Sequence, residues 1–521
     1  MRHSISRIFN QMARTRQGKR LFARLQDRIC AVAAASTCGE MARLVRQGLR
    51  ETRTIELRLD WLRDDGERTR FLRWLKGNRP RRATLLATCR RIVGGGKLTG
   101  GAQAELFWLI QAREAGCQWC DLEMETFREL PEGFLREYPI PRRIMLSIHD
   151  FEETPRLPRK FRVSSNGQMD ALKIAVKANS IGDSVQVLQV ARRSRGLVTV
   201  PMGEVGLPAR ILSLREGSEL AYAPVENPTA PGQVGLTEFK YVYRAHELTT
   251  RSAVYGVIGN PIAHSLSPLL HNTGFASRKM DAVYLPFLVN DLDDFLEAIP
   301  KLGVRGFSVT IPYKVTILKH LAECESLAEK IGAANTVVAR KDGSLYGCNT
   351  DYVGILSVLE RKLDIAGSRV LILGAGGSAR AAAFALIQAG AAVFVCSRRE
   401  VAARELARAA KAETVPRRAL RTEKFDAIIN ATPVGMHPHG GVSPLSPSEL
   451  NCQLVMDLIY RPLRTKLMKV AQARGIKTVS GADMFLAQGF AQWRAWQKQP
   501  PPEAAMRRAV LSRLREEDRS S

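Results

Sequence analysis

Eight short apolar segments recur along the first half of the chain, and their regular spacing is the feature that most limits the possible folds. Most of them start about 25–30 residues apart, and amphipathic stretches such as EMARLVRQGL and AELFWLIQAREAG fill many of the intervals. Eight strands that alternate with helices predict a (β/α)8 barrel of about 220 residues, an α/β fold. The predicted strands are RICAVAAAS from Arg28, TIELRLDWL from Thr54, RATLLATCR from Arg82, QWCDLEME from Gln118, RIMLSIHDF from Arg143, ALKIAVKA from Ala171, LVTVPMG from Leu197 and ELAYA from Glu219.

The second half of the chain opens at AVYGVIGN and also mixes strands with helices. We expect a barrel over residues 28–245, a linker over 246–252, an α/β domain over 253–365 completed by C-terminal helices at 482–521, and a dinucleotide-binding Rossmann domain over 366–481. The first 27 residues hold seven Lys or Arg and one acid without an apolar core, so they predict no secretory signal. We expect a disordered tail, with a transit-like segment or a surface helix as the alternatives.

The stretch VLILGAGGSARAAAFALIQAGAAVFVCSRR has the order strand, glycine turn, helix and strand. Gly374, Gly376 and Ala379 give the G-x-G-x-x-A form of the turn that binds a dinucleotide pyrophosphate. The next strand ends in Ser397, Arg398 and Arg399, where an acid would indicate NAD. Two arginines suit a 2′-phosphate and predict NADP, although a solvated turn is the alternative.

The amino-acid composition limits the class of protein further. A hydrophobic content of 45% and a charged content of 25% are globular values, and no apolar run approaches the roughly 20 residues of a membrane span. Nine scattered cysteines predict a reducing compartment, the cytoplasm. Cys117 and Cys120 lack a second ligand pair, so we expect no metal site. The net charge of +27 fits nucleic acid, membrane surfaces or anionic small molecules.

The polar faces of three predicted barrel strands bear on the chemistry. In LKIAVK, Lys173 alternates with Leu172 and Ile174, and taken alone this pattern favours a one-sided strand with its lysines in water. In a barrel, however, the outer face packs on helices and the inner face carries the site near its mouth. On that parity the inward residues are Glu56, Arg58, Asp60, Ser147, His149 and Lys173.

A lysine inside such a mouth, beside Arg58 and Arg90, is expected to lose proton affinity through burial and like charge. The neutral amine is then a nucleophile that forms a Schiff base with a ketone. His149 can move protons near neutral pH. Together these residues suit an imine-forming enzyme that acts on an anionic ketone.

The barrel resembles type I 3-dehydroquinate dehydratase in the stretches ELRLD, ATCR, DLE, SIHDF, DALKIA, MGEVGLPAR and APGQ. The resemblance implies that Lys173 forms the imine, that His149 is the general base and acid, and that water is eliminated to give 3-dehydroshikimate. It also implies a substrate-binding set of Glu56, Arg58, Arg90, Arg210, Thr229 and Gln233.

One departure from that family concerns the histidine. The family carries an acid, thought to orient the histidine, before a glycine pair in the loop after the third strand, where this chain reads CRRIVGGG with Gly94. No Asp or Glu occurs between Glu67 and Glu105. We therefore expect His149 to be less well held, and a weakened or inactive barrel is the alternative interpretation.

Residues 253–498 resemble shikimate dehydrogenase in YGVIGNPIAHSLSPLLHN, GFSVTIPYK, GAANTV, GCNTDYVG, GAGGSARA, INATPVGM, DLIYRPLRT and GADMFLAQ. Reduction of a ketone needs a proton for the developing alkoxide, and a Lys–Asp pair meets that need. The resemblance implies Lys314 and Asp351 as the catalytic pair. Arg461 stands where the family commonly has Asn, and we expect little effect from it. The implied substrate-binding residues are Ser265, Ser267, Thr310, Asn335, Tyr460 and Gln488; the implied NADP-binding residues are Gly374, Ala375, Gly376, Gly377, Ser378, Ser397, Arg398, Arg399, Leu458 and Gly481.

The sequence thus predicts a bifunctional enzyme of the shikimate pathway, both a lyase and an oxidoreductase, with small-molecule substrates and no nucleic-acid or membrane partner. Two alternatives stay open: a shikimate or quinate dehydrogenase with a weakened barrel, and a DNA-binding or quinate-sensing regulator built on these folds. The choice between monomer and homodimer also stays open.

Overall fold

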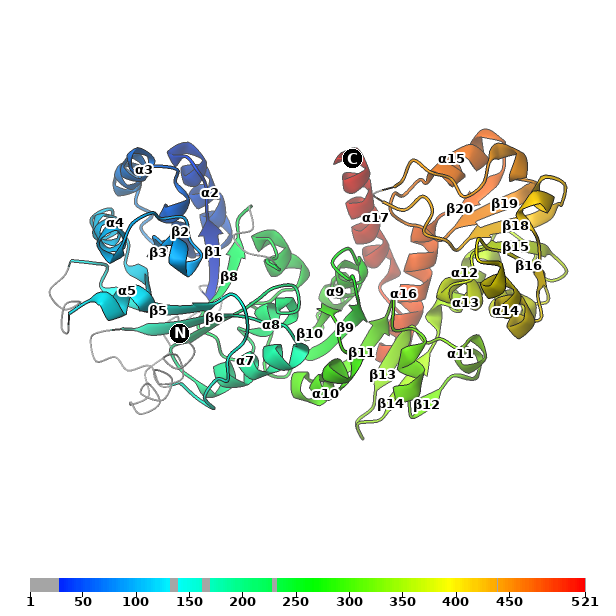
Figure 1. Cartoon of the computed structure of the whole chain (residues 1–521), viewed down its shortest axis with the longest axis horizontal. Coiled ribbons are helices and arrows are strands. Elements are labelled where there is room, and N and C mark those ends of the chain that lie inside the picture. Colours follow the sequence, from blue (N-terminus) through cyan, green and yellow to red (C-terminus); the bar gives the residue numbers. More distant parts are fainter. Residues whose placement is uncertain (1–27, 132–138, 162–168, 227–231, 438, 521) are drawn as a thin grey trace. The chain divides into compact units, whose positions relative to one another are not determined.

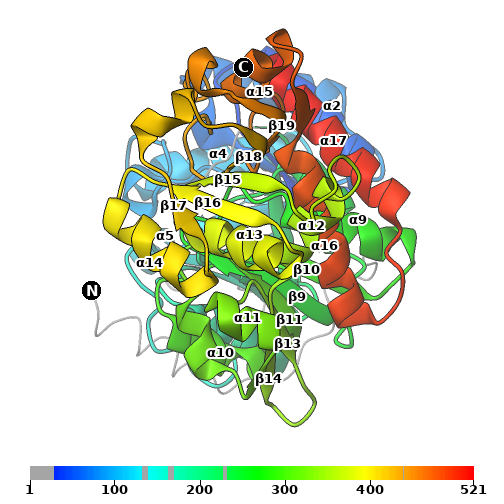
Figure 2. The ribbon, with the colours of Figure 1, turned by 90° about the vertical axis from the view of Figure 1, so that its right-hand side faces the viewer.

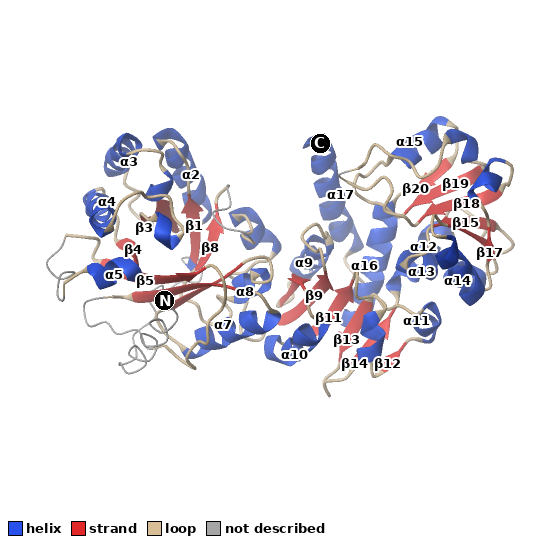
Figure 3. Cartoon of the chain, in the orientation of Figure 1, coloured by secondary structure: helices blue, strands red, loops and turns tan. Residues whose placement is uncertain are grey.

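The computed structural model of the chain describes residues 28–131, 139–161, 169–226, 232–437 and 439–520. The expected N-terminal tail and Thr229 therefore lie outside the described residues. The chain divides into two compact units, one with residues up to 252 together with 285–302, the other with residues 253–284 and 303 onward. Figure 1 labels many of the elements of both units, and Figure 3 marks their helices and strands.

Eight parallel strands form the barrel of the first unit, as the sequence predicts. Their order is β7-β6-β5-β4-β3-β2-β1-β8. Glu219 N donates to Leu197 O over 2.8 Å, which brings the segment before β8 back to β7 and nearly closes the ring. The strands are β1 (Ile29–Ala33), β2 (Thr54–Arg58), β3 (Thr84–Thr88), β4 (Trp119–Glu123), β5 (Arg143–Asp150), β6 (Ala171–Lys177), β7 (Leu197–Met202) and β8 (Ala221–Pro224).

Helices cover the outside of these strands, and local signals fix where they start. Thr37 accepts a hydrogen bond from Glu40 N at the start of the first barrel helix, and Ser180 and Asp183 form a capping box at another. These elements are α2 (Cys38–Glu51), η2 (Leu59–Trp61), α3 (Asp65–Gly77), η3 (Ile92–Gly94), α4 (Ala102–Glu114), α5 (Met124–Glu129), α7 (Ile181–Arg193), α8 (Leu207–Leu212) and the π-helix η4 (Glu238–Val242).

The barrel interior has two layers. One is a packed apolar cluster that includes Leu86, Trp119, Met145 and Ala171, one residue from each of four neighbouring strands. Because side chains alternate along a strand, the residue two positions further on in each of these strands also points inward. Those residues are the buried polar side chains Thr88, Asp121, Ser147 and Lys173.

A second sheet lies at the start of the chain's second half, with the strand order β10-β9-β11-β13-β14-β12. Its β9 and β11 are parallel, whereas β13 runs antiparallel to β11 and to β14. Its strands are β9 (Ala253–Gly259), β10 (Ala282–Leu288), β11 (Val304–Val309), β12 (Glu323–Cys324), β13 (Thr336–Ala339) and β14 (Leu345–Cys348). The helices of this region are α9 (Ser267–Ser277), α10 (Leu292–Leu302), η5 (Thr316–His320), α11 (Ser326–Ile331) and α12 (Thr350–Leu359), with α16 (Gly481–Gln497) and α17 (Glu503–Ser520) at the C-terminal end.

The third sheet is parallel throughout and has the order β17-β16-β15-β18-β19-β20. This is the doubly wound order of a dinucleotide-binding domain, in which the order reverses between the first and fourth strands. Figure 2 shows α13 and α14 against one side of it. The elements are β15 (Arg369–Leu373), α13 (Gly377–Gln388), β16 (Ala392–Cys396), α14 (Glu400–Ala410), β17 (Glu413–Thr414), η6 (Arg417–Arg421), β18 (Phe425–Asn430), η7 (Pro447–Glu449), β19 (Cys452–Asp457), α15 (Lys466–Ala473) and β20 (Lys477–Val479).

Small residues let α13 approach this sheet closely. Ala379, Ala382 and Ala383 are fully buried in the core that also holds Val370 and Ile372 of β15. Ala379 is the third small residue of the G-x-G-x-x-A turn, so it occupies the packing position that the motif requires.

All nine cysteines of the chain are free thiols in the structure. Within the described ranges, no helix combines the length and the hydropathy needed to cross a membrane.

Candidate active sites

Lys173 lies inside the barrel and is 4% exposed. Its ammonium donates to Asp121 Oδ2 over 2.7 Å and is 3.7 Å from Glu56 Oε1. It also lies 4.4 Å from the centre of the Tyr222 ring. Burial raises the pKa of the Asp121 carboxyl, but Lys173 and Arg90 outweigh burial and hold this pKa below its ordinary value. The lysine therefore sits in a closed pocket of opposite charge.

Arg90 lies beside the lysine, as expected, since both donate to Asp121 Oδ2, but carboxylates that the expectation left out pair with these positive charges. Arg58 forms two hydrogen bonds with Asp60, of 3.0 and 2.8 Å. Arg90 donates to Glu123 over 2.6 Å and to Asp121 over 3.1 Å. A buried charge is costly unless it is paired, and here each arginine is paired: Arg58 with Asp60, and Arg90 with Glu123 and Asp121.

His149 lies near the C-terminal end of β5, and its Nδ1 is 3.1 Å from Glu123 Oε2. Its ring stacks on Phe151 at a centroid distance of 5.8 Å. Burial lowers the pKa of His149, and Arg90 lowers it further against the opposing effect of Glu123. The imidazole is thus neutral at neutral pH, as a general base must be.

Arg210 differs from Arg58 and Arg90, because no carboxylate of the described residues pairs with its guanidinium. Its Nε donates to Pro201 O over 2.6 Å, while both terminal nitrogens are buried and have no hydrogen-bond partner among the residues that the structure describes. Burial lowers the pKa of this guanidinium to about 10. A buried cation with two unused donors is suited to bind a carboxylate in a bidentate way.

The remaining predicted barrel residues take two kinds of position. Glu56 accepts a hydrogen bond from the Thr88 hydroxyl over 2.8 Å, so it is held within the polar layer. Gln233 is half-buried just beyond the undescribed segment that contains Thr229.

The second site centres on Lys314 and Asp351. Lys314 Nζ donates to Asp351 Oδ2 over 2.5 Å, and Asn335 Nδ2 donates to Asp351 Oδ1 over 2.7 Å. Asp351 lies in the first turn of α12, where the helix N-terminus favours a negative charge. Asn335 is fixed in turn, because its Oδ1 accepts from Thr350 N over 2.7 Å. A lysine, a carboxylate and an amide therefore meet from three separate segments.

Residues from four further segments belong to the set expected around Lys314 and Asp351. Ser265 is half-buried and its Oγ accepts from Ser267 N over 3.2 Å, while Thr310 is half-buried after β11. Gln488 of α16 is buried and lies 3.5 Å from the Thr350 hydroxyl, so it is joined to the Asn335 network. Tyr460 stacks on Phe485 at 4.9 Å.

The glycine turn lies beside the Lys314 pair. Gly374 has φ of +108°, and an added Cβ would meet Ala431 O at 3.0 Å, so a side chain is excluded there. Gly376 has open space where its Cβ would be, and a Cβ on Gly377 would lie 3.6 Å from Lys314 Cδ. Ser397 is half-buried, and Arg398 and Arg399 are exposed after β16. Gly481 is packed against Ile459 O, where a Cβ would come to 2.3 Å.

Comparison with known proteins matches both halves of the chain. Residues 29–250 match the family model of type I 3-dehydroquinase, 257–337 the shikimate dehydrogenase substrate binding domain, and 481–511 the shikimate 5′-dehydrogenase C-terminal domain. A chloroplastic bifunctional 3-dehydroquinate dehydratase/shikimate dehydrogenase of Arabidopsis thaliana is 32% identical over 483 residues, which is 86% of this chain and 78% of the relative.

The chain belongs to this bifunctional dehydratase/dehydrogenase family. The family assignment agrees with both resemblances seen in the sequence. An NADP⁺ shikimate dehydrogenase of Bacillus cereus (strain ATCC 10987) is 42% identical over 274 residues, covering 50% of this chain and 98% of the relative. The shikimate 5-dehydrogenase of Thermus thermophilus, solved with NADP(H) and shikimate, is 34% identical and covers 50% of this chain and 99% of that chain with a TM-score of 0.47.

Two carboxylates of the dehydratase barrel were missed by the sequence reasoning. Asp121 contacts Lys173, and Glu123 contacts both His149 and Arg90. A signal for them was present, because the alternation in QWCDLEME places Trp119, Asp121 and Glu123 on one face of their strand. The alternation that predicts the inward residues of β2, β5 and β6 therefore also predicts Asp121 and Glu123 as inward residues of β4.

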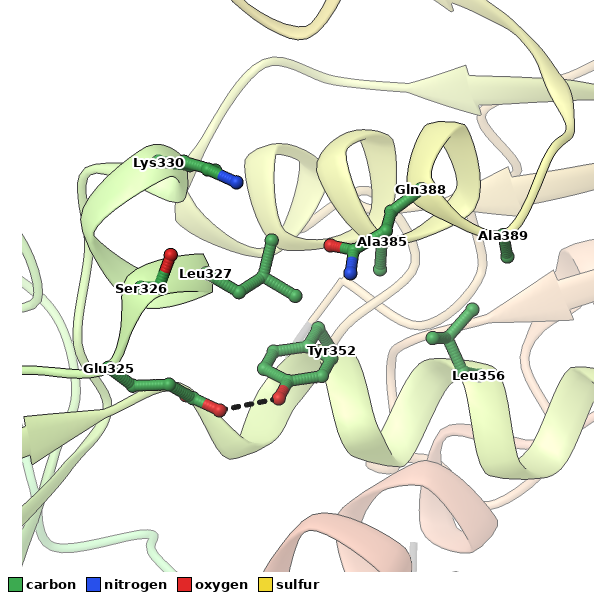
Figure 4. Close-up of a pocket in the computed structure, with 9 residues that line it drawn as sticks. All are labelled: Glu325, Ser326, Leu327, Lys330, Tyr352, Leu356, Ala385, Gln388 and Ala389. Carbon is green, nitrogen blue, oxygen red and sulfur yellow. Dashed lines mark hydrogen bonds between the residues drawn. The ribbon is translucent and has the colours of Figure 1, made fainter.

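A separate pocket of about 380 Å³ lies in the dehydrogenase part, between α11, α12 and α13 (Figure 4). Tyr352 donates to Glu325 Oε1 over 2.6 Å at its edge, and Leu356 lines it further along α12. None of the predicted site residues lines this pocket.

Proposed function

We propose that the barrel dehydrates 3-dehydroquinate to 3-dehydroshikimate and that the second site reduces this product to shikimate with NADPH. The observation that carries the first half is the buried Lys173 side chain within a carboxylate pocket, together with the buried Arg210 guanidinium, two of whose nitrogens have no partner within the described ranges. An amine for the ketone and a cation for the carboxylate are the two groups that such a substrate needs.

The barrel residues account for each proton of the dehydration. The Lys173 side chain, held by Asp121, first loses a proton to solvent, and the free amine adds to the ketone. A proton is taken up again as water leaves, which gives the protonated imine. The imine withdraws electrons, so His149 can remove a proton from the adjacent carbon. His149 then protonates the leaving hydroxyl, which departs as water. Hydrolysis of the imine releases the product and restores Lys173.

Borohydride trapping tests this half. Incubation of the full chain with 3-dehydroquinate and borohydride should add the mass of the reduced substrate to Lys173, and the Lys173→Met variant should gain none. A wild-type protein that is folded but gains no adduct would support the alternative of a dehydrogenase with an inactive barrel.

In the second site, we propose that Lys314 delivers the proton to the alkoxide and that Asp351 holds Lys314 and accepts from the substrate hydroxyl. Ser265 and Ser267 would bind the substrate carboxylate, with Thr310, Asn335, Tyr460 and Gln488 around the ring. NADPH supplies the hydride when it is bound.

The chain's own residues fit that cofactor. The turn from Gly374 to Ser378 leaves open space at Gly376 next to the N-terminus of α13, as a pyrophosphate requires. Ser397, Arg398 and Arg399 would hold the 2′-phosphate, with Leu458 and Gly481 near the nicotinamide. The Arg398→Ser/Arg399→Ser double variant should lose about a hundredfold in kcat/KM for NADPH while the value for NADH stays within twofold. An equal loss with both cofactors would contradict this assignment.

We also propose that residues 28–245 carry the dehydratase and that 253–365, 366–481 and 482–521 carry the dehydrogenase, in the cytoplasm. The free cysteines support a reducing compartment.

Separate assays with 3-dehydroquinate and 3-dehydroshikimate on the full chain test both activities, and light scattering decides between monomer and homodimer.

A further inference from the structure

Gly94 marks a place where the dehydratase barrel departs from its family, because an acid is expected there to orient the histidine. Gly94 is the last residue of η3 and is buried. A Cβ at this position would lie 3.0 Å from Glu123 Oε2 and 3.3 Å from Glu123 Cδ. The space next to Gly94 is therefore filled by a carboxylate that comes from another element, the end of β4.

The Glu123 carboxylate is held on both of its oxygens. Oε1 accepts from Arg90 Nε over 2.6 Å and from the Ser147 hydroxyl over 3.0 Å. Oε2 faces His149 Nδ1 at 3.1 Å. The side chain is 3% exposed, so its orientation is fixed by these contacts.

The backbone behind this carboxylate is also held. Glu123 N donates to Glu105 Oε1 over 3.3 Å, and Glu105 Oε2 accepts from the Thr126 hydroxyl over 2.5 Å. The residue that faces His149 thus has a support of its own in α4 and α5.

We propose that Glu123 is the positioning residue of His149, and that it takes over from β4 the role of the acid that is absent at position 94. This inference rests on the proposed dehydratase function. A carboxylate that accepts from Nδ1–H fixes the tautomer of the imidazole, and Nε2 is then left free to take the proton from the substrate. Gly94 is part of the same arrangement, because a side chain there would displace the carboxylate.

The test uses Glu123→Gln, Glu123→Asp and a matched control in the full chain. The Gln amide can donate to Nδ1 and so hold the wrong tautomer, and we expect kcat for dehydration to fall at least about a hundredfold. The kcat of Glu123→Asp should be at least about tenfold higher than that of Glu123→Gln. The control is Glu125→Gln, which changes an exposed acid two residues further on and should leave kcat unchanged.

Two readouts separate positioning from a merely structural role. Without the carboxylate the imidazolium is less stable, so the acidic limb of the kcat–pH profile should move to lower pH in Glu123→Gln. Borohydride adduct formation at Lys173 should persist in that variant, because the imine forms before His149 acts. If the wild-type protein itself forms no borohydride adduct at Lys173, the proposed dehydratase function is contradicted instead.

A kcat within threefold of wild type and an unmoved acidic limb in Glu123→Gln would overturn the proposal. If that variant does not fold, ¹⁵N spectra of histidine-labelled wild type decide the matter. The His149 signal, identified by its loss in His149→Gln, should show the proton on Nδ1, and a proton on Nε2 alone would overturn the inference.

Discussion

At the scale of single residues, Gly94 limits what can be placed beside His149. We expect Gly94→Ala to lower the dehydratase kcat about tenfold, because the new methyl group must push the Glu123 carboxylate away from His149. Gly94→Glu, which restores the acid that the family carries, should lower kcat further, since two carboxylates would compete for one space.

Steady-state assays with 3-dehydroquinate measure both variants, and the dehydrogenase activity of the same preparations serves as the control for folding. A Gly94→Glu variant that is faster than wild type would contradict the arrangement described here.

His271 of α9 gives a prediction about stability. It is fully buried, its Nε2 lies 3.2 Å from Gln492 Oε1, and it stacks on Tyr284 at 4.5 Å. Burial lowers its pKa from 6.5 to about 4. As the pH falls below about 6.5, the unfolded chain takes up a proton at His271 that the folded chain does not. The free energy of unfolding therefore decreases by up to about 3 kcal/mol as the pH falls from about 6.5 towards 4.

Thermal midpoints recorded between pH 7 and pH 4.5 check this prediction. His271→Phe keeps an aromatic ring but cannot titrate, so its midpoint should fall less steeply with acid than that of wild type. The exposed His439→Gln variant should follow the wild-type curve. Parallel curves for all three proteins would exclude His271 as the source of acid sensitivity.

At the scale of elements, the two glycines Gly374 and Gly376 have different roles in the turn between β15 and α13. Gly374 has a positive φ and a carbonyl within 3.0 Å of its would-be Cβ, whereas Gly376 has open space at that point. We expect Gly374→Ala to lower both thermal stability and NADPH affinity, because an alanine at this positive φ, with its Cβ against Ala431 O, would strain the turn. Gly376→Ala should keep the thermal midpoint and lose about tenfold or more in NADPH affinity, because its methyl group occupies the approach to the pyrophosphate.

Fluorescence titration with NADPH and thermal unfolding of the same preparations test this pair of glycines. Gly367→Ala offers a comparison at a positive φ of +75° with nothing within 4 Å, and it should lose stability alone. A Gly376→Ala variant with wild-type affinity would place the pyrophosphate elsewhere.

At the scale of the whole molecule, Arg461 joins distant segments of the dehydrogenase unit, and from these contacts we predict a larger effect than the sequence alone suggests. It donates to His264 O over 2.5 Å, next to Ser265, and to Glu517 Oε1 of α17 over 2.9 Å. Because Asn is too short to span these partners, Arg461→Asn should raise the KM for shikimate about fivefold with a smaller change in KM for NADP⁺.

Initial rates with each substrate varied in turn check this prediction, and Glu517→Gln, which weakens one of the two partners, should give a smaller rise. An unchanged KM for shikimate in Arg461→Asn would show that the loop at Ser265 keeps its position without this contact.

The sequence by itself determined the strands, the turns and which side chains point inward. The alternation in ALKIAVKA places Lys173 opposite its apolar neighbours, and the glycine turn requires Gly374 whatever lies around it. These are local properties of the backbone, so a short window of residues contains them. The site residues derived in this way stay predictions until the variants are measured.

Only the tertiary structure decided which charges meet. Asp121 and Lys173 are 52 positions apart, and Arg461 and His264 are 197 apart. The parallel register aligns Glu123 with Ser147 and Ser147 with Lys173 across β4, β5 and β6, which brings the acids of one strand to the lysine and histidine of others. Such pairs depend on strand order and register, and no local pattern encodes them. For that reason the absence of an acid at Gly94 indicated a weakened histidine, whereas the fold supplies Glu123 from a neighbouring strand.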